Sequence, residues 1–235
     1  MAVDDLPLPV VNFLNVIGIP WPYVDEDMVS QFAAFVRQFA TAVQTTHDDA
    51  TRAVTGITSA YKGSSTDAMV SGWAKLSARH VDEIVDGCHM LADALDVAAG
   101  YIVAQKAEAV AVLIGMAVAF VADQAAAVAT AGIAEAAVPV IIAGAERLVK
   151  SLVMDLQQYI VGKVLETAAK PLFAKVENAL LGLDWSQSGA QVEPADGFSI
   201  DHDALARHLA VLDSHADTMR QHGDRFAQSL AGLSF

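Results

Sequence analysis

Seven histidines are the side chains of this sequence best suited to acid–base chemistry or metal binding. Three of them, His208, His215 and His222, fall at steps of seven near the C-terminus. Helical residues seven apart lie about 10 Å apart along the axis, whereas helical metal sites usually take ligands three or four residues apart. The spacing therefore predicts that the three histidines lie along one flank of a helix, next to the face that packs on a partner helix. A pH-sensitive pairing of helices is the alternative interpretation.

The other candidate bases and nucleophiles lack catalytic partners in the sequence. His80 falls in an apolar helical seam, and His89 lies between Asp86 and Asp93 on a polar helix face. The single cysteine, Cys88, excludes an internal disulfide and has no basic neighbour that would activate its thiol. No hydrolase, zinc-protease, phosphate-loop or dinucleotide motif occurs. We therefore expect no enzyme, no cofactor and no metal site.

The charge balance narrows the class of partner. The chain has 235 residues with 14 Lys and Arg against 28 Asp and Glu, for a net charge of −14. Binding to a phosphate backbone needs a basic surface, so nucleic acid is excluded as a partner. The hydrophobic share of 54% indicates a chain that folds around a core rather than an acidic disordered one.

A transmembrane span is the main alternative to a buried core for residues 109–145. The longest uncharged run between Glu108 and Glu146 is Ala109–Ala122, which is shorter than the roughly 20 residues that a bilayer span requires. We therefore expect helices that are apolar on nearly every side to form the centre of the domain.

Two heptad patterns organise the N-terminal part of the chain. The first begins after Asp25, a candidate helix N-cap, and the second ends near residue 99. The polar loop Lys62–Asp67 separates them, which predicts an antiparallel helical hairpin over about 25–59 and 66–99.

The rest of the chain predicts further helices. Gly132 marks a turn in the alanine-rich segment, Pro139 begins the next helix, and a last piece follows Pro171. The fold class is therefore all-α, an elongated helical bundle built on a long antiparallel hairpin with alanine-rich central helices. The predicted domains are 1–182, with the hairpin at about 25–99 and alanine-rich helices at about 101–182, a linker at 183–199, and an amphipathic helix at 200–235.

The C-terminal helix has a candidate N-cap at Asp201 and a regular apolar seam that predicts a helical partner. The seam consists of Leu205, Leu209, Leu212, Met219, Phe226 and Leu230. This helix resembles the first helix of a further hairpin.

The corner of the hairpin carries an aromatic–glycine pair. Tyr61-x-Gly63, followed by Trp73, between two heptad helices resembles the WXG100 (ESAT-6-like) superfamily, with Tyr61 in place of the family's tryptophan. The lead-in "IPWPYVDED" before the first helix resembles the larger WXG100-like N-terminal domain of actinobacterial polymorphic toxins. The resemblance covers roughly residues 6–182.

This resemblance implies a non-catalytic domain that targets a C-terminal toxin for type VII secretion and docks small WXG100-type helical-hairpin proteins. It implies that Tyr61, Gly63 and Trp73 form half of an export signal. Tyr101 lies where the family's second signal, Y-x-x-x-[DE], is expected, but Gln105 replaces the acid. The expected location is cytoplasmic before export and secreted afterwards, with cell-surface association as an alternative. The alternative function is a membrane-inserting or channel-forming domain that helps deliver the toxin.

Overall fold

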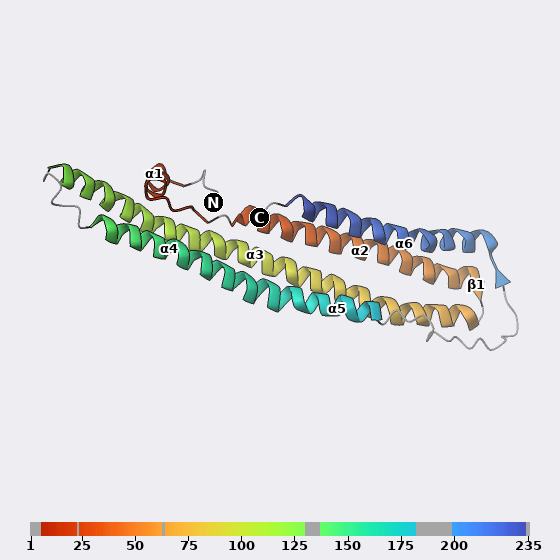
Figure 1. The fold of residues 1–235 in the computed structure, drawn as a ribbon. Coiled ribbons are helices and arrows are strands. Elements are labelled where there is room, and N and C mark those ends of the chain that lie inside the picture. The colour runs from red at the N-terminus through yellow and green to blue at the C-terminus, as the bar shows by residue number, and fades with distance from the viewer. Residues whose placement is uncertain (1–5, 23, 63, 130–136, 182–198, 234–235) are drawn as a thin grey trace. The chain divides into compact units, whose positions relative to one another are not determined.

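The computed structural model describes residues 6–22, 24–62, 64–129, 137–181 and 199–233. Its helices are α1 (Leu8–Ile17), α2 (Glu26–Ala60), α3 (Ser64–Ala129), α4 (Val138–Tyr159), the π-helix η2 (Ile160–Ala169), α5 (Lys170–Leu181) and α6 (His202–Ala231) (Figure 1). Two strands of two residues each, β1 (Tyr61–Lys62) and β2 (Ser199–Ile200), pair antiparallel. The predicted all-α bundle on a helical hairpin is confirmed.

Local sequence explains where two of the helices begin. The Asp25 carboxylate accepts hydrogen bonds from the backbone N–H groups of Asp27 and Met28 at 2.9 and 3.2 Å. Asp201 caps α6 in the same way, accepting from the N–H of Ala204 at 3.0 Å. Each carboxylate satisfies N–H groups that have no partner inside the helix, and its charge favours the positive end of the helix dipole. Both predicted caps are confirmed.

Helix α3 differs from the predicted second arm of the hairpin because it does not end near residue 99. It continues through Gly100 and Tyr101 to Ala129. No proline interrupts this stretch, and alanine is the strongest helix former, so Gly100 and Gly115, at about 1 kcal/mol each, do not stop the helix. The predicted turn at Gly132 lies outside the described residues, while Pro139 lies in the first turn of α4 as expected.

The helix after α4 widens before a proline. Pro171 lies in the first turn of α5, directly after η2. Proline cannot donate a backbone hydrogen bond, and its ring clashes with the carbonyl four residues earlier. The wider π turns of η2 accommodate this defect without ending the helix.

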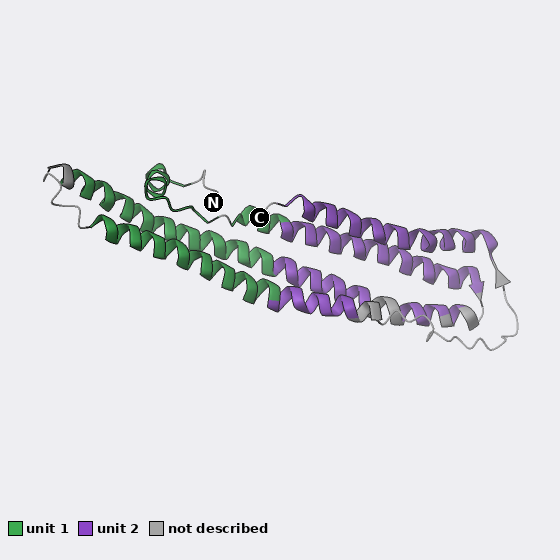
Figure 2. Ribbon diagram, viewed as in Figure 1, with its two compact units in different colours: residues 1–31, 94–165, 235 green, residues 32–93, 166–234 purple. Residues whose placement is uncertain are grey.

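The chain divides into two compact units (Figure 2). The first unit contains residues 1–31 and 94–165, together with residue 235. In it α3 runs antiparallel to α4, as the Tyr101–Tyr159 ring pair and the contact of Met116 with Gly144 show. Helix α1 lies against α3 through Phe13 and Phe120, whose ring centroids are 5.4 Å apart.

The second unit contains residues 32–93 and 166–234. Arg37 bonds Asp93 at 2.7 Å, and Trp73 bonds Thr51, so α2 and α3 run antiparallel. Helix α5 packs on α3, where Leu172 covers Gly87. Helix α6 runs antiparallel to α2, with Phe226 beside Phe39 and His208 beside Gly56.

Helix α2 buries a wider arc than one seam in the second unit. Along α2 the aromatic residues of the heptad pattern, Phe32, Phe35 and Phe39, recur at steps of three and four and are half-buried. Ala33, Val36 and Ala40 are fully buried. A helix with neighbours on two sides needs an apolar stripe broader than a two-helix seam. The heptad pattern therefore located the helix but not the whole buried face.

Candidate functional site

The hairpin corner joins the end of α2 to the start of α3. Tyr61 is half-buried and pairs through its backbone with Ile200 in β2. The N–H of Asp201 donates to the carbonyl of Ala60 at 2.7 Å, so the start of α6 is fixed to the same corner. Gly63 lies outside the described residues. The structure thus adds a second chain segment at the corner that sequence reasoning did not foresee.

Trp73 lies inside the helical contact rather than at the corner. Its indole N–H donates to the hydroxyl oxygen of Thr51 on α2 at 3.0 Å. The imidazole of His47 stacks on the indole at 5.6 Å between centroids and 11° between planes. From α6, His215 meets the indole edge-on at 5.9 Å and 73°. Trp73 therefore connects three helices of the second unit.

The three spaced histidines of α6 all face the hairpin. His222 Nε2 lies 2.8 Å from the hydroxyl oxygen of Thr46. His208 lies so close to Gly56 that a Cβ there would meet its Cε1 at 2.3 Å. In the described part of the chain, His215 Nε2 is buried and has no hydrogen-bond partner. The three histidines thus lie at a helical interface, as predicted, and the helices that they contact are α2 and α3 of the same unit.

Burial dominates the electrostatics of this cluster. Desolvation lowers the pKa of His47 from 6.5, although the negative charges of Asp82 and Asp48 oppose the shift. Desolvation also lowers the pKa of His215, and the neighbouring His47 lowers it further. Both imidazoles are therefore held in the neutral form at neutral pH.

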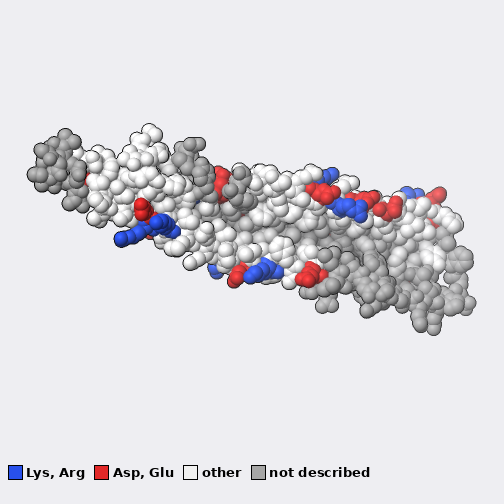
Figure 3. Space-filling model, viewed as in Figure 1, with Lys and Arg blue, Asp and Glu red and all other residues white. Residues whose placement is uncertain are grey.

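The apolar seam predicted on α6 is only partly covered. Five of its residues are half-buried, namely Leu205, Leu212, Met219, Phe226 and Leu230, while Leu209 is 49% exposed. Phe226 stacks on Phe39 with 4.9 Å between ring centroids. A hollow of about 170 Å³ beside this pair is lined by Phe35, His222 and Arg225. No side chain of α6 is fully buried, and acidic and basic side chains lie side by side along it (Figure 3).

Tyr101 belongs to the first unit, whereas Tyr61 and Trp73 belong to the second. Its ring stacks on Tyr159 of α4 with 3.8 Å between centroids and 9° between planes. The structure therefore gives Tyr101 a packing partner and does not group it with the corner residues.

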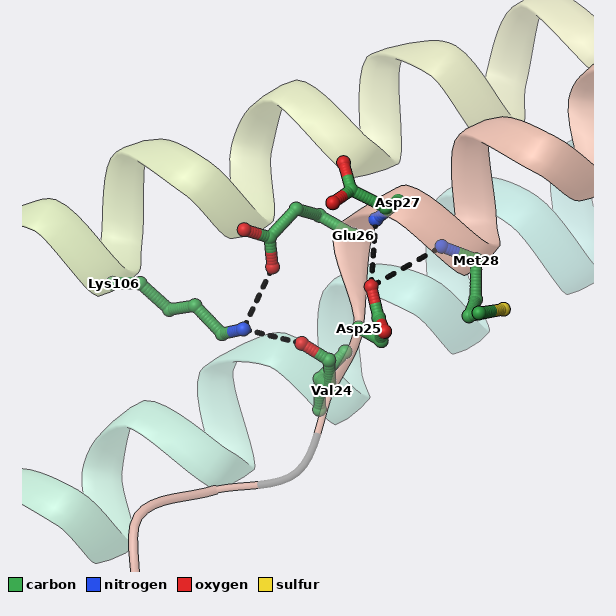
Figure 4. A network of polar contacts seen from close by, with 6 residues as sticks. All are labelled: Val24, Asp25, Glu26, Asp27, Met28 and Lys106. Carbon is green, nitrogen blue, oxygen red and sulfur yellow. Dashed lines mark hydrogen bonds and ion pairs between the residues drawn. The ribbon is translucent and has the colours of Figure 1, made fainter. Parts of the chain in front are cut away.

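A buried ion pair in the first unit was missed by sequence reasoning. Lys106 Nζ lies 2.7 Å from Glu26 Oε2 and also donates to the carbonyl of Val24 (Figure 4). Lys106 is 1% exposed and Glu26 is 6% exposed. The available signal was the position of Lys106, four residues after Ile102 and seven before Leu113 on one apolar helix face.

The described residues carry no arrangement that resembles a catalytic centre. No group of three or more His, Cys, Asp or Glu side chains among them could hold a metal ion. Burial raises the pKa of the Cys88 thiol to about 11, which disfavours the reactive thiolate. His80 is half-buried and His89 is exposed.

The alanine-rich helices are less covered than the sequence led us to expect. Exposed apolar side chains on α3 and α4 of the first unit include Val97, Val103, Val112, Ile114, Val118, Val121, Val140 and Met154. Within the described residues, the segment His80–Ala126 of α3 is long and apolar enough to cross a membrane, and an 18-residue stretch of it has a mean hydropathy of 1.9. Only 22% of that stretch is buried. These helices therefore do not form the fully buried core that the sequence predicted.

Comparison with known proteins gives a match to a protein family. A family model described as "WXG100 like domain" matches residues 5–145, which is more than half of the chain and includes α1, α2, β1, α3 and the start of α4. Neither a curated protein nor a solved structure matches the chain.

Proposed function

Since the chain belongs to the WXG100-like domain family of non-catalytic helical domains related to type VII secretion, we propose that it targets a polymorphic toxin for export and docks helical partners. The observation that carries this proposal is the family match, because it spans both arms of the hairpin and the corner between them. In this proposal the domain is exported through the type VII system, and its partners are small WXG100-type hairpin proteins and the secretion machinery.

The exposed apolar residues of the first unit support partner docking. Val118, Val121 and Val140 are 62%, 66% and 72% exposed. Covering a valine side chain contributes about 1.5–3 kcal/mol, so a helical partner that covered several of them would gain affinity from this surface. The net charge of −14 favours a partner with an apolar face over a polyanion.

The corner is the proposed recognition element. Tyr61 is half-buried at the junction of α2 and β1, and Tyr61→Ala removes its ring without deleting a helix. We expect a local cost of about 1–3 kcal/mol, which a long bundle absorbs. Export of the toxin-bearing chain should then fall much more than the melting temperature of the purified domain.

Two matched variants make this test specific. Tyr61→Phe keeps the ring and should be exported. Tyr159→Ala removes a ring of the same size far along the chain from the corner, and export should fall only in step with stability. Normal export of Tyr61→Ala would show that the corner is structural and remove the main support for its recognition role.

The apolar character of His80–Ala126 favours a second candidate function, a membrane-inserting domain that helps deliver the toxin. Against it, Glu108 and Asp123 would each cost several kcal/mol if they faced lipid. We therefore expect the chain expressed without detergent to stay in the supernatant after ultracentrifugation. Carbonate-resistant pelleting with membranes would favour insertion instead.

A further inference from the structure

Histidines form much of the contact between α6 and the hairpin in the second unit. His208 lies on Gly56, His222 lies 2.8 Å from the Thr46 hydroxyl oxygen, and His215 meets Trp73. Because α6 is helical and these residues are seven apart, every second turn of its inner face presents an imidazole to α2 or α3. Adding protons to this interface would place positive charges along it.

Trp73 holds two of the imidazoles close together. His47 stacks on the indole and is 5% exposed, while His215 contacts the indole edge. His215 Nε2 is buried without a hydrogen-bond partner among the described residues, so a proton there would have no acceptor in the docked helix. The site accommodates neutral imidazoles and is unsuited to charged ones.

We propose that α6 is a pH-released cover, which stays docked on α2 and α3 while His47 and His215 are neutral and detaches when they take up protons. Two positive charges, one on the face and one at the edge of the Trp73 indole, repel each other, and each loses hydration in the contact. The opposing attraction is modest, because no side chain of α6 is fully buried.

The surrounding charges determine which histidine responds more strongly. Asp82 on α3 and Asp48 on α2 face His47 and partly offset its positive charge. The charge that faces His215 is that of His47, which adds repulsion. The further histidines of the contact, His208 and His222, face Gly56 and Thr46. Protonation of His215 is therefore the step that most strongly opposes docking.

The pKa shifts of His47 and His215 indicate in which direction the docking of α6 changes with pH, and over which pH range. Burial lowers the pKa values of His47 and His215 below 6.5 in the docked state, whereas a released helix returns them toward 6.5. Protons therefore bind the released state more tightly. Docking is at full strength above pH 6.5 and weakens as the pH falls from 6.5 through the lowered values.

The start of α6 is attached to the hairpin corner, and this attachment determines which end of the helix opens first. Ser199 and Ile200 pair with β1, and the N–H of Asp201 bonds the Ala60 carbonyl at 2.7 Å. None of these backbone bonds titrates between pH 5 and 8. The end of α6 near Phe226 should therefore open first, while its start stays attached to the corner.

Amide hydrogen exchange of the full chain at pH 7.5 and pH 5.0, corrected for intrinsic exchange, tests this proposal. Each proton taken up favours the released helix over the docked one, so we expect residues 212–231 to lose several-fold of their protection at pH 5.0. Protection of residues 33–43 on α2 should change much less. Equal protection of α6 at both pH values, or parallel loss in α2 and α6, would overturn the proposal.

Two variants connect the effect to His215. His215→Phe keeps an aromatic ring against Trp73 but cannot bind a proton, so the pH-dependent loss of protection should shrink at least threefold. His202→Gln changes an exposed histidine at the start of the same helix and should leave the loss unchanged. A folded His215→Phe variant that loses protection with pH as the wild-type chain does would refute the proposal. If this variant does not fold, the exchange of the wild-type chain at pH 7.5 and pH 5.0 decides alone.

Discussion

The Nζ of Lys106 lies 2.7 Å from Oε2 of Glu26, a residue eighty positions earlier in the chain. The same ammonium group donates to the carbonyl of Val24, directly before the N-cap of α2 (Figure 4). The pair therefore fixes the lead-in of α2 to α3 within the first unit. It also satisfies two ionised groups that burial would otherwise leave without solvation.

Removing one partner of this pair should strongly destabilise the first unit. Lys106→Ala leaves the Glu26 carboxylate buried without its cation, so we expect a loss of about 3–5 kcal/mol in the free energy of unfolding. Lys106→Met with Glu26→Gln removes both charges and should recover most of that loss. Denaturant unfolding followed by circular dichroism measures both, and Lys170→Ala, which breaks an exposed pair with Glu166, should cost less than about 1 kcal/mol.

Gly56 should resist substitution by alanine although it lies within a helix. A Cβ at this position would meet the His208 ring at 2.3 Å, so the ring must leave its site on α2. Overpacking of this kind costs about 1–3 kcal/mol, which exceeds the roughly 1 kcal/mol that alanine contributes to helix propensity. We expect a lower melting temperature for Gly56→Ala.

Two further variants identify the cause in the Gly56 experiment. Gly72→Ala in α3 meets no atom within 4 Å and should raise the melting temperature. His208→Ala combined with Gly56→Ala should restore stability, because the smaller side chain leaves room for the new methyl group. A stabilising Gly56→Ala on its own would contradict the close contact.

Tyr101 should behave as a packing residue. Its stack on Tyr159 is an aromatic pair worth about 0.5–1.5 kcal/mol beyond the area that it buries. Tyr101→Ala should therefore lower the free energy of unfolding by about 1–3 kcal/mol and reduce export only in proportion. Tyr101→Phe keeps the stack, and a stable Tyr101→Phe chain that is not exported would show instead that a partner reads the hydroxyl group.

Cys88 should be unreactive in the folded protein. Burial raises the pKa of its thiol to about 11, so at pH 8 about one thiol in a thousand is ionised, against roughly a quarter for a free cysteine. Labelling with a chromogenic disulfide reagent at pH 8 should be at least about 100-fold slower in the native protein than in denaturant. Rapid native labelling would mean that the contact of α3 around Cys88 opens readily.

Much of the secondary structure followed from the sequence alone. Capping by Asp25 and Asp201, the polar corner between α2 and α3 and the proline in the first turn of α4 are local features whose effects extend over one or two turns. Heptad spacing is also local, because it reports which residues share a helix face. Together these features determined the all-α class and most helix boundaries, except where α3 continues past Gly100 without a residue that would stop it.

The pairing of those faces was decided only by the tertiary structure. Lys106 forms an ion pair with Glu26, a residue far away in the sequence. The ring contacts of Tyr101 with Tyr159 and of His215 with Trp73 also join residues that are far apart in the sequence. An apolar seam specifies that a helix needs a neighbour, but many helices of similar periodicity satisfy that need equally well. The burial that lowers the pKa of His215 arises from the particular neighbours that fold around it, so no pattern within α6 could have predicted it.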